Sequence, residues 1–128
     1  MLQIDGANTF EQGTAQFVHG AEMLLSGVSG VAHTGAEDLW HGAMAVLQGA
    51  EAVSVPDPSL LPYAAEIYSG AEALYKSGQL ASSAAEMMTG AQDITQGLSD
   101  SPNELVNGAD KLVAGAHAYV WEHPTQGS

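Results

Sequence analysis

Two pairs of histidine and carboxylate are the strongest candidates for chemistry in this 128-residue chain. His19 is followed three residues later by Glu22, and Asp38 is followed three residues later by His41. On a helix this spacing places an imidazole and a carboxylate on one face, as in the metal sites of di-iron helical bundles. No Glu-x-x-His motif completes a ligand set, and three of the four residues fall on the polar side of the repeat described below. A metal-binding helical bundle is therefore the third of three interpretations, and we expect no metal and no cofactor.

The sequence contains no catalytic arrangement built around a hydroxyl or thiol nucleophile. Nucleophilic catalysis needs a hydroxyl beside a base and a third group that orients the base. The serines instead stand at expected helix starts and among the small residues of the repeat. The chain contains no cysteine, which excludes disulfides, thiolate metal sites and thiol redox chemistry. We therefore expect a protein that is not an enzyme.

A seven-residue repeat covers most of residues 10–120. A large apolar residue is followed by two variable residues, then Gly, then usually Ala or Thr, as in Phe17-Val-His-Gly20-Ala21. The outward positions are mostly polar, which is typical of an amphipathic helix and not of a glycine-rich loop. Ten glycines share the same position of the repeat: Gly13, Gly20, Gly27, Gly42, Gly49, Gly70, Gly90, Gly97, Gly108 and Gly115.

Glycine destabilises the interior of a helix. Each one costs about 1 kcal/mol relative to alanine, so ten cost on the order of 10 kcal/mol, comparable with the whole stability of a domain. A compensating contact is needed. Without side chains at this position, two helix backbones can approach more closely than the usual 8–10 Å and gain dispersion contacts. The ten glycines are therefore interpreted as helix-packing seams between closely packed helices.

The position directly after the large residue is also apolar, although it should be peripheral. It widens the apolar arc of each helix to about 160°, more than a two-helix contact needs. We therefore expect each helix to contact two neighbours, one of which can belong to another copy. The residues of this row that we assign to an association face are Trp40, Leu47, Tyr68 and Tyr75. The hypothesis predicts a homo-oligomer or assembly that strengthens as salt screens repulsion between copies.

Capping signals divide the repeat into helices. The signals are Asn8-Thr-Phe-Glu11, Thr34-Gly-Ala-Glu37, Asp57-Pro58, Ser83-Ala-Ala-Glu86 and Ser101-Pro102-Asn-Glu104. They predict an all-α single domain over residues 1–128, with five antiparallel helices at about 8–32, 35–54, 58–77, 80–98 and 102–121. Connections of two to five residues favour antiparallel neighbours.

The charge is strongly negative, at −13, with Lys76 and Lys111 as the only basic side chains besides the histidines. Such a chain cannot neutralise phosphates, so we expect no nucleic acid among its partners. No stretch reaches the roughly 18 apolar residues of a spanning helix, so we also expect no membrane insertion. The first nine residues lack the pattern of a signal peptide. The expected locations are extracellular by a signal-less route, or cytoplasmic, including a salt-rich cytoplasm.

The heptad of a large residue, Gly and Ala resembles the xxxLxxG heptad repeats in the extracytoplasmic regions of phage-infection-protein-like and secretion-associated proteins. That resemblance implies a helical structural role and transfers no catalytic residues. Trp40-His41-Gly42 also resembles the Trp-x-Gly motif of small secreted proteins of type VII secretion systems. In that family the motif stands in a turn between two long helices. The tripeptide is either such an export motif or part of the repeat.

The leading functional interpretation is thus a non-enzymatic structural or interaction protein that self-assembles, or packs on a helical partner, through its Gly-Ala seams. The alternative, from another class, is a secreted substrate or helper of a type VII-like secretion system.

Overall fold

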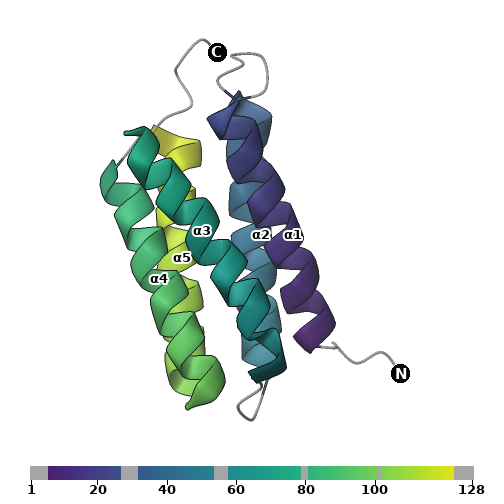
Figure 1. Cartoon of the computed structure of the whole chain (residues 1–128). Helices are drawn as coiled ribbons and strands as arrows, with labels where there is room; N and C mark the ends of the chain where they lie inside the picture. The colour runs from purple at the N-terminus through teal and green to yellow at the C-terminus, as the bar shows by residue number, and fades with distance from the viewer. Residues whose placement is uncertain (1–5, 27–31, 54–57, 79–80, 101, 123–128) are drawn as a thin grey trace.

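A computed structural model describes residues 6–26, 32–53, 58–78, 81–100 and 102–122 of the chain, and this part is helical throughout, with no strand. The predicted all-α class is confirmed. The elements are α1 (Gly6–Leu25), α2 (Ala32–Ala52), the short 3-10 helix η2 (Pro58–Leu60), α3 (Leu61–Ser77), α4 (Ala81–Ser99) and α5 (Pro102–Glu122). The five α-helices pack against one another along their lengths (Figure 1).

The helices form a closed ring. Helix α1 packs most extensively on α2, and α4 on α5, so the chain consists of two close hairpins with α3 between them in sequence. Helices α2 and α5 join the hairpins on one side, and α3 joins them on the other by contacting both α1 and α4 (Figure 1). Going around the ring, the order is therefore α1, α2, α5, α4 and α3. Each helix has two neighbours in its own chain.

Successive helices run in opposite directions, as predicted (Figure 1). A ring of alternating directions cannot close with an odd number of members, so one adjacent pair of the five must be parallel. That pair is α1 and α3. Tyr63 of α3 contacts Glu11 of α1, and seven residues later Gly70 lies beside Phe17 and Ala21, so residue numbers rise together along both helices.

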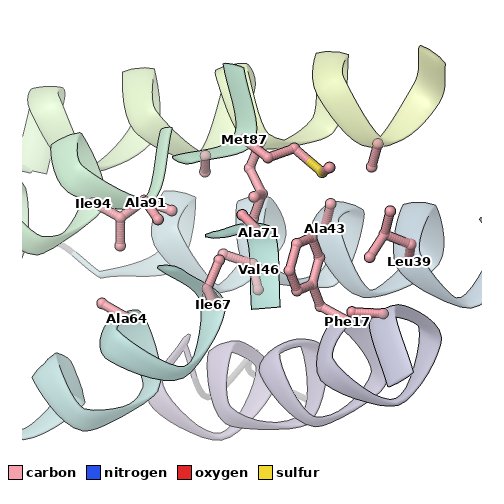
Figure 2. Packing of buried hydrophobic residues seen from close by; sticks show 14 of the residues in the cluster. Phe17, Leu39, Ala43, Val46, Ala64, Ile67, Ala71, Met87, Ala91 and Ile94 are labelled. Carbon is pink, nitrogen blue, oxygen red and sulfur yellow. The ribbon is translucent and has the colours of Figure 1, made fainter. Parts of the chain in front are cut away.

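The core fills the inside of the ring. The large residue of each heptad is buried on every helix, including Phe17, Leu39, Ile67, Met87 and Leu112, all of which are fully buried. Figure 2 shows Phe17, Leu39, Ile67 and Met87 converging from different helices, with alanines of the repeat such as Ala43 and Ala71 between them. Thr14 takes one alanine position, and its hydroxyl donates a hydrogen bond to the carbonyl of Phe10 at 2.9 Å, so no polar group is stranded there. The core therefore combines the large apolar residue of each heptad with a nearly equal share of alanine.

The predicted bounds were wrong at the first two helices. Helix α1 spans Gly6–Leu25 and not 8–32, and α2 begins at Ala32, so the expected cap residues Asn8 and Thr34 lie inside helices. The extra start of α1 carries Gly6, which packs on the backbone of α2 at Gly49, and this packing outweighs the local capping preference. At the other end of α1, the Ser26 hydroxyl donates to the carbonyl of Met23 at 2.7 Å, which competes with continuing the helix.

The other three helices follow their predicted bounds to within a few residues. Pro58 begins η2 and Pro62 lies in the first turn of α3, where a missing N–H removes no helical hydrogen bond. Helix α3 ends at Gly78, whose φ of 83° is left-handed and whose N–H donates to the carbonyl of Tyr75. Ser83, a predicted cap, is instead buried inside α4. The caps expected at Asp57 and Ser101 lie outside the described residues.

Candidate functional site

Both α1 and α2 contribute glycines to the contact between them. A Cβ built at Gly13 would lie 2.7 Å from the carbonyl oxygen of Gly42, and one built at Gly20 would lie 2.6 Å from that of Gly35. Gly49 meets the backbone of Gly6 and Phe10 in the same way. Real Cβ atoms essentially never come this close to a backbone atom. These positions therefore accept no side chain unless the two helices move apart.

Helices α4 and α5 make a second contact of the same kind. A Cβ at Gly90 would lie 2.6 Å from the carbonyl oxygen of Gly108, and the reverse distance is the same. Gly97 meets the backbone of Leu105, and Gly115 meets that of Ser83. Ser83 thus occupies the place opposite Gly115 that Gly108 holds opposite Gly90. This explains why a serine is buried at that point.

Gly70 differs from the other described glycines of the repeat. It lies on the side of α3 that faces α1, but a Cβ there would be 3.6 Å from both Ala21 Cβ and the Phe17 ring, which is ordinary contact. Helix α3 is therefore not held against α1 by touching backbones. Gly27 lies outside the described residues.

Two glycines in the contact between α1 and α2, Gly6 and Gly35, were missed by the sequence interpretation. Each stands seven residues before a repeat glycine, Gly13 or Gly42. The signal was present, but Gly6 was left before the first predicted helix and Gly35 was assigned to the capping sequence of the second.

The structure does not bring the four residues of the expected association face into one row. Trp40 and Leu47 belong to α2, and Tyr68 and Tyr75 belong to α3, two helices that are not adjacent in the ring. The Trp40 ring stacks on His41 at 5.3 Å between centroids and meets the His117 ring of α5 edge-on at 5.7 Å. Leu47 and Tyr68 are half-buried against the core, and Tyr75 is 46% exposed.

The histidine and carboxylate pairs meet across α1 and α2. His19 Nδ1 lies 3.1 Å from Asp38 Oδ2 on the outside of the helix pair. Within the described residues, however, no group of three or more His, Asp or Glu side chains is close enough to hold a metal ion. The contact between His19 and Asp38 therefore joins two helices, and the structure does not assemble around it the ligand set that a bundle metal site uses.

An apolar groove lies between α1 and α3. It has a volume of about 390 Å³ and is lined by Val18, Ala21, Glu22 and Leu25 of α1 and by Ala65, Glu66, Ser69, Gly70 and Ala73 of α3. The groove lies where the parallel helices α1 and α3 meet. Gly70 is part of its lining, and a Cβ at this glycine would make only ordinary contacts with α1. It is within the size range of ligand and peptide sites, about 300–1,000 Å³. This groove is the candidate functional site.

Comparison with known proteins supplies no relative. No protein-family model, curated protein or solved structure matches the chain. Trp40-His41-Gly42 lies within α2 and not in a turn between helices. Among the described helices, none has the length and apolar character needed to cross a membrane. The function must therefore be inferred from the groove and its surroundings.

A polar contact joins α1 and α3 near the N-terminal end of each helix. The Tyr63 hydroxyl donates a hydrogen bond to Glu11 Oε2 at 2.7 Å. This bond, helped by the negative charges of Glu11 and Glu66, raises the pKa of Tyr63 above its ordinary value because the phenol loses the bond when it ionises. The two helices are thus joined at Glu11 and Tyr63, and the groove begins within the next two turns of each helix.

The Tyr63 contact predicts a pH dependence. A group whose pKa is raised by folding contributes stability that is complete below its unfolded pKa, about 10 for tyrosine, and is lost as pH rises through the folded value. The melting temperature of the wild type should therefore exceed that of Tyr63→Phe at neutral pH, and the difference should shrink above about pH 10. Lys111, whose pKa is raised by its hydrogen bond to Asp93, titrates equally in both proteins and cancels. A difference that is constant to pH 11 would show that this bond contributes nothing.

Proposed function

We propose that this protein is a non-enzymatic helical interaction protein that binds a helix of a partner in the groove between α1 and α3. The observation that carries the proposal is the groove itself, an apolar depression between two helices of the ring. Its apolar lining includes Val18, Ala21 and Leu25, and Leu25 is 39% exposed. A helix laid in such a groove would bury this apolar surface.

The closed ring changes what the wide apolar arc implies. The sequence allowed one of the two neighbours of each helix to belong to another copy, whereas the contacts of this chain supply two neighbours for every helix. Trp40, for example, is partly covered by His117 of α5. The groove is an apolar depression that the ring leaves open to a partner, whereas the other exposed large apolar side chains, Met44 and Tyr75, lie outside its lining. Because two copies would each carry a net charge of −13, charge repulsion favours a different protein over a second copy.

Site-specific cross-linking in cells tests this proposal. A photoactivatable residue replaces Ala73, which lines the groove, or Met44, which is 39% exposed on the outer side of α2 and serves as the control. We expect a discrete adduct at Ala73, identified by mass spectrometry as a helical segment of one other protein, and none at Met44. Both variants should retain the wild-type circular dichroism spectrum.

Three outcomes would contradict the proposal. Equal labelling at the two positions would mean that contacts with the groove are random. No adduct at Ala73 in cells that produce the protein would mean that the groove is not occupied. An adduct with this same chain, accompanied by sedimentation as an oligomer that grows with ionic strength, would replace the partner by self-assembly through this face.

A further inference from the structure

We infer that the groove selects a cationic amphipathic helix, in which a row of apolar side chains is flanked by lysine or arginine. This inference rests on the proposed function and names the chemistry of the partner. It is carried by the shape of the groove, by the two glutamates on its borders and by the absence of any basic side chain in this chain that can neutralise them.

The shape of the groove matches a helix of about two turns. Its α1 border runs from Val18 to Leu25 and its α3 border from Ala65 to Ala73, which at 1.5 Å per residue is about 11 Å of helix. Small residues on the α3 side, such as Ser69 and Gly70, allow another helix backbone to approach. A docked helix of this length presents apolar residues at positions i, i+3 or i+4, and i+7. Three such anchors fill the groove.

The charges on the borders define the polar part of the partner. Glu22 lies on the α1 border and Glu66 on the α3 border, and both side chains are exposed. The only two lysines of the chain are elsewhere: Lys76 lies 3.7 Å from Glu72, and Lys111 lies 2.6 Å from Asp93. A partner with basic residues on both sides of its apolar row can pair with both borders, whereas an acidic helix is repelled.

No segment of this chain supplies such a helix. Residues 1–5 and 123–128, which precede and follow the described part, contain neither lysine nor arginine. A second copy carries the same excess of negative charge and the same two lysines, so it offers no basic flanks. The occupant is therefore a helix of another protein.

The test uses labelled peptides and the whole protein in solution. The probe is a peptide of about 18 residues, long enough to form a helix on binding, with leucines at helical spacing and lysines on both flanks. Two matched peptides carry glutamate in place of every lysine, or the same residues in an order without an apolar face. Fluorescence anisotropy measures Kd from low to moderate ionic strength. We expect saturable 1:1 binding of the lysine peptide alone, weakened by salt.

Variants of the protein locate the binding. Glu22→Gln with Glu66→Gln should weaken binding about fivefold at low ionic strength, as expected from two exposed ion pairs. The matched control, Glu51→Gln with Glu86→Gln, removes the same charge from exposed positions on α2 and α4, and should change Kd less than twofold. Ala73→Leu fills the groove without changing charge and should weaken binding about tenfold or more. Circular dichroism shows whether each variant remains folded.

Other results would overturn the inference in distinguishable ways. If both double variants bind equally, or the reordered peptide binds as well, attraction is to the net charge and not to the groove. If the glutamate peptide binds as tightly as the lysine peptide, the groove takes helices without charge selection, and only the proposed function survives. If a cationic single-chain amphiphile binds with the same dependence on Ala73 and no peptide does, the site is for a small ligand and both proposals fail.

Discussion

Replacing Gly42 or Gly108 by leucine should lower the stability of the fold far more than the better helix former can restore. Leucine favours an isolated helix by nearly 1 kcal/mol over glycine. A Cβ at Gly42, however, would overlap the backbone of Phe17, and one at Gly108 would lie 2.6 Å from the backbone nitrogen of Ile94. The helices of each hairpin must separate along their length to admit a side chain. Overpacking of this kind costs typically about 1–3 kcal/mol and can cost more.

Thermal and urea denaturation followed by circular dichroism measure this effect. For a chain of this size, a net loss of about 2–3 kcal/mol lowers the melting temperature by roughly 10 °C. Gly70→Ala is the matched control, because its Cβ would meet only ordinary contacts of 3.6 Å. This substitution should raise stability by up to about 1 kcal/mol. A rise in melting temperature for both leucine variants would show that the helices do not depend on close contact at these glycines.

Truncating Phe17 to alanine should be the most damaging change in the core. The side chain is fully buried, and its ring lies under Gly70 at the junction of α1, α2 and α3. Removing such a ring typically costs about 3–5 kcal/mol, because apolar burial is lost and a cavity remains. The alanines around it cannot extend into the space. Near a usual domain stability of about 5–15 kcal/mol, this change can leave the protein only marginally folded.

Met44→Ala is the control for the Phe17 variant. Met44 is 39% exposed on the outside of α2, so its truncation should change the free energy of unfolding by less than about 0.5 kcal/mol. Urea denaturation gives both values from the midpoint and the slope. A loss below about 1 kcal/mol for Phe17→Ala would mean that the ring is not part of the packed interior.

The repeat was sufficient to predict the helices, because a seven-residue period specifies which direction around a helix each residue faces. Phe17 and Ile67 were placed inside on this basis, and both are fully buried. Composition predicted a core of small side chains, which is only partly right because Phe, Leu, Ile, Met and Val outnumber alanine among the buried apolar residues. It also predicted a surface with very few cations. The local capping signals were less informative. Asn8 and Thr34 have the chemistry of caps, but both lie inside helices, and Gly6 packs on α2 ahead of Asn8.

The period does not specify which helix lies in each direction, and only the tertiary structure decided this. The same glycine position meets a touching backbone at Gly42, in the hairpin of α1 and α2, but not at Gly70, where α3 packs on α1 as the parallel pair of the ring. Ring closure likewise placed Trp40 against α5 and separated it from Tyr75. The groove exists only where residues about fifty positions apart, such as Val18 and Gly70, line the same depression. No local pattern in the sequence contains that information, since it depends on how all five helices close around one core.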